Sequence, residues 1–203
     1  AYVSTLANDF TDGLALQAIK LVFEFLERSV KNGASDPEAR EKMHNASTIA
    51  GMAFANAFLG MNHSLAHKIG GRFHTPHGRT NAILMPHVIR YNGTRPQKTA
   101  TWPKYNYYKA DVKYQEIAKM LGLPASTAAE GVESFAQACS ELAKKVGIQM
   151  AFKDQKINEK EWMDSRREIA LLAFEDQCSP ANPRLPMVED MEEILTKAYF
   201  GDK

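Results

Sequence analysis

The sequence predicts an all-α protein, a multi-helix bundle of seven to nine helices. Apolar residues recur at intervals of three and four, capping residues precede these segments, and no stretch alternates between apolar and polar residues as a half-buried strand does. The chain has 203 residues, of which 44% are hydrophobic, so it is long enough to bury a core. We therefore expect residues 1–203 to form one helical domain.

The first half of the chain contains four helical segments. Their predicted ranges are 12–30, 37–58, 62–69 and 79–91. Asp36 and Pro37 provide a cap and a first-turn proline for the second segment. Gly70 and Gly71 are expected to end the third, and Pro86 is expected to kink the fourth or stop it early.

The second half contains four more segments after a stretch, 92–109, that is interpreted as a long ordered loop rich in tyrosine. Their predicted ranges are 112–121, 127–147, 161–174 and 187–200. Asp111 is expected to cap the first of them. Thr127 with Glu130, and Asn158 with Glu161, have the spacing of capping boxes ahead of the next two.

Composition argues against several classes of function. Lys and Arg number 25 against 24 Asp and Glu, and the two signs are interspersed, so no basic stripe is available for nucleic acid. No apolar run approaches the roughly 20 residues that span a bilayer, and no secretory leader is recognisable. Cys139 and Cys178 form neither a CxxC motif nor a disulfide framework. A cytoplasmic protein that binds neither nucleic acid nor membrane is expected.

The main functional clue is a cluster of histidines. Five of the six fall within 25 positions: His63, His67, His74, His77 and His87. His63 and His67 are four apart, which places both on one face of a helix within reach of a single iron or zinc ion. The alternative is that they are ordinary helix-face histidines with hydrogen-bonded neighbours.

His77 strengthens the metal interpretation. It lies between Pro76 and Gly78, a rigid residue and a permissive one, just after a glycine-rich turn. Spacing alone leaves open whether His63 pairs with His67 or with His77 as ligands.

Three segments around these histidines form a recognisable pattern. Residues 51–60 read GMAFANAFLG, residues 63–67 read HSLAH, and residues 76–82 read PHGRTNA. They resemble the signature of the iron-containing alcohol dehydrogenases. Residues 8–13, 88–92 and 174–184, with the tyrosine-rich loop, are similar to the bifunctional aldehyde-alcohol dehydrogenases of fermentative microbes. The resemblance covers essentially the whole chain and implies the C-terminal helical domain of the alcohol dehydrogenase part.

The resemblance also implies roles for individual residues. In that family an Asp and three His bind the metal, and the last two His are fourteen apart, which matches His63 and His77. His67 corresponds to a histidine near the nicotinamide and substrate that is discussed as a proton relay, and Phe54 to an aromatic residue beside the nicotinamide. No family role is carried over to His74, which is expected either beside the ligands or on the surface, and His87 is expected to be packed rather than catalytic.

The resemblance implies an NAD-linked enzyme that interconverts acetaldehyde and ethanol with Fe²⁺, or alternatively Zn²⁺. The family's Asp and first His ligand are expected in a D-x-x-x-H motif just before Ala1, and the nucleotide-binding N-terminal domain that grips NAD(H) is expected outside this chain. The fragment alone should then be inactive. A homo-oligomer or filament is expected.

Two rival functions remain at this stage. A metal-dependent hydrolase would use the same histidines, but Ser64 and Leu65 stand between His63 and His67, so the acid of an HExxH motif is missing. A non-catalytic helical interaction or oligomerisation module would use the histidines structurally.

Overall fold

The computed structural model describes residues 1–96 and 108–201, and within these ranges the chain is all-α, as predicted. The elements are α1 (Asp9–Asn32), α2 (Pro37–Ala57), α3 (Met61–Phe73), α4 (His77–Gly93), α5 (Ala110–Met120), α6 (Ala128–Lys145), the 3-10 helix η1 (Phe152–Gln155), α7 (Glu159–Phe174), the 3-10 helix η2 (Ser179–Ala181) and α8 (Val188–Phe200). Most of the loop predicted over 92–109 lies outside the described residues. None of the described helices is long and apolar enough to cross a membrane.

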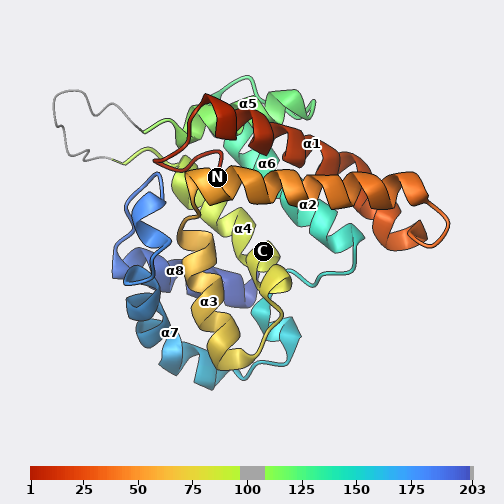
Figure 1. Ribbon diagram of the computed structural model, residues 1–203. Coiled ribbons are helices and arrows are strands. Elements are labelled where there is room, and N and C mark those ends of the chain that lie inside the picture. Colours follow the sequence, from red (N-terminus) through yellow and green to blue (C-terminus); the bar gives the residue numbers. More distant parts are fainter. Residues whose placement is uncertain (97–107, 202–203) are drawn as a thin grey trace.

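Helix α4 separates two groups of helices (Figure 1). On one side α1 and α2 lie side by side as an antiparallel pair near α5 and α6, and on the other side α3 lies with α7 and α8 (Figure 1). The two groups have separate apolar cores, and consecutive α4 residues serve both: Val88 packs into the core of α3, α7 and α8, whereas Ile89 packs into the core of α1, α5 and α6. The position of α3 relative to α1 therefore depends on α4.

Local capping explains where most helices begin. The side chain of Asn8 accepts hydrogen bonds from the backbone of Phe10 and Thr11, and the hydroxyl of Thr11 accepts one from the backbone N–H of Asn8. This capping box makes α1 start three residues earlier than predicted. Asp36, Thr127 and Asn158 cap α2, α6 and α7 at the predicted places.

The predicted cap of α5 is wrong. Lys109 is the N-cap residue, and Asp111 lies inside the first turn. An acidic side chain is favourable there as well, because it lies near the positive end of the helix dipole.

The predicted end of the third helix at Gly70 and Gly71 is also wrong, and Pro86 does not stop the fourth helix early. Helix α3 continues through Gly70 and Gly71 because Phe73 still packs on the buried Trp162, with ring centroids 5.2 Å apart; the left-handed residue that ends the helix is His74, at φ 53°. Helix α4 runs through Pro86 to Gly93, with residues buried on nearly every side. Burial against two cores offsets the roughly 3 kcal/mol that an interior proline costs.

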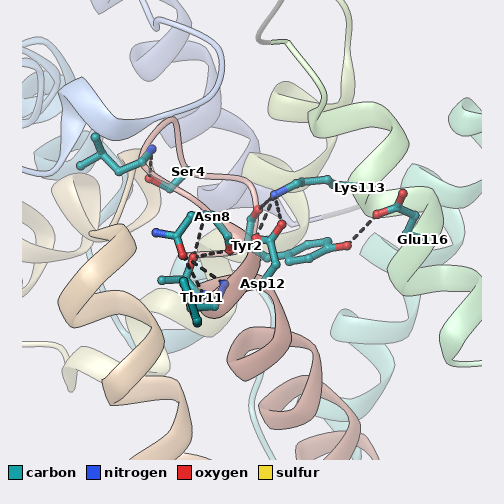
Figure 2. A network of polar contacts seen from close by, with 9 residues as sticks. Tyr2, Ser4, Asn8, Thr11, Asp12, Lys113 and Glu116 are labelled. Atoms are coloured by element: carbon teal, nitrogen blue, oxygen red, sulfur yellow. Dashed lines mark hydrogen bonds and ion pairs between the residues drawn. The ribbon is translucent and has the colours of Figure 1, made fainter.

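A network of polar contacts ties down the first residues of the chain (Figure 2). Lys113 donates to the carboxylate of Asp12 at 2.7 Å and to the carbonyl of Tyr2 at 2.7 Å, and the Tyr2 hydroxyl donates to Glu116 at 2.6 Å. Ser4 donates to the carbonyl of Ala57, the last residue of α2. Residues 1–12 are thereby held against both α2 and α5.

One buried side chain, Asn182, joins the start of α3 to α4 and to the loop that contains Arg184. Its Oδ1 accepts from the backbone N–H of Met61 at 3.1 Å, the first residue of α3, and its Nδ2 donates to Oδ1 of Asn92 on α4 at 2.7 Å. It also donates to the carbonyl of Arg184 at 2.6 Å. A Cβ on Gly60 would lie 2.8 Å from this same Oδ1, so the close approach requires glycine.

Asn182→Ala should lower the free energy of unfolding by about 2–4 kcal/mol, because α3 loses a cap and the buried Asn92 loses a partner. Urea unfolding followed by far-ultraviolet circular dichroism measures the change. Asn45→Ala, at an exposed position of α2, is the matched control and should change stability little. A loss below 1 kcal/mol for Asn182→Ala would mean that this side chain does not organise the start of α3.

Candidate metal centre

Three of the clustered histidines meet in space. His63 and His67 lie on successive turns of α3, and His77 is the first residue of α4. Ring centroids are 5.3 Å apart for His63 and His77, 5.5 Å for His67 and His77, and 6.1 Å for His63 and His67. The structure thus brings together the three residues that the sequence singled out.

His63 is electrically suited to bind a cation as a neutral ligand. Burial, followed by repulsion from His77 and His67, lowers its pKa from 6.5 to about 4. Its imidazole is therefore uncharged at neutral pH, and a neutral imidazole is the form that coordinates metals.

His77 is oriented by two asparagines. The Nδ2 of Asn81 lies 3.1 Å from Nε2 of His77 and also donates to the His77 carbonyl at 3.0 Å, while Asn62 donates to Oδ1 of Asn81 at 2.7 Å. Because an amide nitrogen can only donate, Nε2 of His77 is the unprotonated nitrogen and accepts this hydrogen bond. A metal ion bound at Nε2 would take the place of Asn81 as the partner of its lone pair.

His67 contacts a buried acid instead. Its Nδ1 lies 3.2 Å from Oδ2 of Asp176, which also accepts from Nζ of Lys68 at 2.8 Å, and Oδ1 accepts from the backbone N–H of Cys178 at 3.0 Å. Burial by itself would raise the pKa of Asp176, but the hydrogen bonds from Lys68, Cys178 and His67 outweigh it and keep this pKa below its ordinary value. Asp176 is therefore an ionised acceptor.

His67, Asp176 and Cys178 form a second possible metal-binding group, since their ligand atoms all lie within 4.8 Å of one another. Two features weigh against a cation there. Burial and the neighbouring Asp176 raise the pKa of Cys178 to about 11, so its thiol is protonated, and the Lys68 ammonium already occupies the carboxylate.

A cavity of about 170 Å³ lies beside His63. Ala1, Asn62 and Asn182 line it together with His63. The Oδ1 of Asn62 is buried and has no hydrogen-bond partner among the described residues. An acceptor in this state suits a donor group or a cation that would enter the cavity.

The remaining predicted residues lie elsewhere. Phe54 is 42% exposed on the last turn of α2, and its place beside a nicotinamide stays a prediction. His74 is exposed and ends α3, in agreement with the surface alternative. His87 is buried within α4, as expected of a packed residue.

Sequence reasoning missed Asp176, Lys68, Asn81 and Asn62 as members of the site. Asp176 reaches His67 from a loop 109 positions away. The only available signal was its place in segment 174–184, which was noted for its resemblance to the family but given no role.

Acidification should destabilise the chain through His63. Its pKa is about 4 in the folded chain against 6.5 for an ordinary histidine, so the unfolded chain binds more protons between these values and the free energy of unfolding falls as pH drops from 6.5 to 4. In urea unfolding at a series of pH values, His63→Gln should flatten this decline. His44→Gln, exposed on α2, is the control for loss of one imidazole. Identical pH slopes for wild type and His63→Gln would contradict the assignment.

Known proteins resemble this chain along its whole length. The chain is 73% identical over 203 residues to an aldehyde-alcohol dehydrogenase of Streptococcus pneumoniae and 43% identical over 204 aligned residues to the bifunctional aldehyde-alcohol dehydrogenase of Escherichia coli strain K12. These alignments cover 100% and 99% of this chain, respectively, but only 23% of the length of each relative.

The fold is shared with solved structures. An alcohol dehydrogenase from Oenococcus oeni superposes with a TM-score of 0.85 at 32% identity, over 98% of this chain and 47% of that one. Residues 1–199 match the description "Fe-containing alcohol dehydrogenase family, C-terminal". This chain belongs to the iron-containing alcohol dehydrogenase family and corresponds to its C-terminal helical part.

Proposed function

We propose that residues 1–203 form the metal-binding helical domain of an NAD-dependent alcohol dehydrogenase within a bifunctional aldehyde-alcohol dehydrogenase. Its reaction interconverts a short-chain aldehyde, acetaldehyde foremost, and the corresponding alcohol. The observation that carries this proposal is the convergence of His63, His67 and His77 in a chain of this family.

Ring geometry favours His63 and His77 as the metal ligands. Imidazole lone pairs lie in the ring plane, and two imidazoles bound to one ion through bonds of about 2.0–2.1 Å have ring centres about 5 Å apart. His63 and His77 are inclined by 54° at 5.3 Å, so their planes can converge. His67 and His77 are stacked at only 15°, so their lone pairs lie in nearly parallel planes.

The donor set fits Fe²⁺, with Zn²⁺ as the alternative, because both accept neutral imidazole. The other ligands are expected from an Asp and a His in a segment that precedes residue 1 in the full enzyme. Ala1 lines the same cavity as His63, so a chain arriving at Ala1 would deliver those ligands to this place.

In this proposal the three histidines have different roles in the reaction. His63 and His77 hold the ion, and His67, whose side chain is 35% exposed, passes a proton between the substrate oxygen and water. Bound iron supplies Lewis acidity toward the carbonyl oxygen, and the nicotinamide supplies the hydride. NAD(H) binds mainly to the N-terminal nucleotide-binding domain, the partner of this chain, with Phe54 and His67 beside the nicotinamide. We place the enzyme in the cytoplasm.

A second candidate function, a helical interaction or oligomerisation module, is favoured by exposed apolar side chains. Phe10 is 87% exposed, Leu185 71% and Met187 59%. Such residues are suited to contacts with the N-terminal domain or with further copies in a homo-oligomer or filament. Light scattering of this chain, with and without the N-terminal half, separates self-association from domain pairing.

Metal content tests the ligand pair. In the enzyme completed with its N-terminal half and loaded anaerobically with Fe²⁺, His63→Ala and His77→Ala should each abolish iron binding, measured by mass spectrometry. His74→Ala, an exposed neighbour, is the control and should retain it. His67→Ala should also retain iron, and loss of iron from that variant would show that the ligand pair is wrong.

Turnover tests the reaction. NADH consumption with acetaldehyde should be absent from this chain alone and appear when the N-terminal half is present, because the metal and nucleotide sites are then complete. His67→Ala should lower kcat roughly 100-fold or more. A completed protein that binds iron no better than this chain and consumes no NADH would leave the histidine cluster with a structural role.

A further inference from the structure

Asp176 is the buried charged group at the site to which the proposed function assigns no task. We propose that Asp176 is a positioning residue that holds the neutral His67 ring in the tautomer with its proton on Nδ1, which leaves Nε2 as the nitrogen that exchanges protons. This inference rests on the proposed role of His67 as the proton relay.

The chemistry of the contact determines the tautomer. An ionised carboxylate can only accept hydrogen bonds, and Oδ2 of Asp176 lies 3.2 Å from Nδ1 of His67. Nδ1 must therefore carry a proton to make this bond, and in a neutral ring the lone pair is then on Nε2. With the opposite tautomer, two acceptors would face each other beside a buried charge.

Asp176 is held firmly enough to impose this choice. Its side chain is only 7% exposed, and the backbone N–H of Cys178 and the ammonium of Lys68 fix its two oxygens. The loop is in turn attached to α3, because Ser179 donates to the carbonyl of Ala173 at 2.6 Å and its Oγ lies 2.9 Å from Oγ of Ser64, whose hydroxyl can donate to it. The loop that carries Asp176 is therefore attached to α3, the helix that carries His67, which fixes the position of the carboxylate relative to the ring.

The arrangement also sets the orientation of the ring. His67 is stacked on His77, inclined by 15°, while Nδ1 is tied to Asp176. Stacking fixes the ring plane, and the hydrogen bond fixes rotation within that plane. Two constraints of this kind position Nε2 without any contact to Nε2 itself.

The first experiment reads the tautomer directly. Long-range ¹H–¹⁵N spectra of the ¹⁵N-labelled metal-free chain, with His67→Gln used to assign the signals, distinguish the protonated from the unprotonated ring nitrogen. Wild-type His67 should be protonated on Nδ1. Asp176→Asn should abolish this preference, because an amide can donate to Nδ1 as well as accept from it, and exposed Glu175→Gln should preserve it.

Protonation of Nε2 in the wild-type chain would overturn the proposal without any variant, so the test does not depend on Asp176→Asn folding. An unchanged tautomer in folded Asp176→Asn would overturn it as well.

The second experiment asks whether Asp176 acts through His67. In the completed enzyme, Asp176→Asn should lower kcat roughly 10- to 100-fold, with the KM for aldehyde and the iron content unchanged. Added to His67→Gln, it should cause no further loss. An equal loss in both backgrounds would assign Asp176 a structural role. If the wild-type enzyme shows no turnover, the proposed function fails while the spectra still decide the tautomer.

Discussion

The hydrogen bonds of Asn182 are the constraint on which the histidine site depends. Its Oδ1 receives the first free N–H of α3 at Met61, and its Nδ2 reaches Asn92 near the end of α4. A helix that starts one residue later would be turned by about 100°, because 3.6 residues complete a turn. His63 and His67 would then face away from His77. One buried amide thus sets the register of α3 against the two segments that complete the site.

The connection between α2 and α3 is strained where it meets this constraint. Phe58, which ends α2, has φ 63° and ψ −170°, a conformation that favours glycine and costs of order 1–3 kcal/mol. Contacts on both sides hold it there: Ser4 donates to the carbonyl of Ala57, and Asn182 accepts from Met61. Packing outweighs this strain, because α2 and α3 pack into different apolar cores. Their relative direction is therefore set by packing and not by the turn between them.

Sequence predicted most of the fold and singled out the three histidines that meet, but not their polar neighbours, and the division has a physical basis. Caps such as Asp36 and Thr127 were predictable because capping involves residues within one turn. The meeting of His63 and His67 follows from helix periodicity. The continuation of α3 through Gly70 was not predictable, because it depends on Phe73 packing against Trp162 from α7. Asp176 was missed for the same reason, since a tertiary contact brings it to His67.

The three imidazoles also differ in the partner that each ring has, and the proposed division between metal binding and proton transfer follows this difference. His63 is desolvated and has its pKa lowered to about 4, so it stays neutral at neutral pH. His77 faces an amide donor, so its Nε2 is unprotonated and accepts that hydrogen bond. Of the three rings, His67 is the one hydrogen-bonded to an anion, Asp176, which orients its Nδ1. Under the proposed roles, the proton relay lies beside an anion, whereas burial and the neighbouring histidines keep His63 neutral and His77 faces a neutral amide.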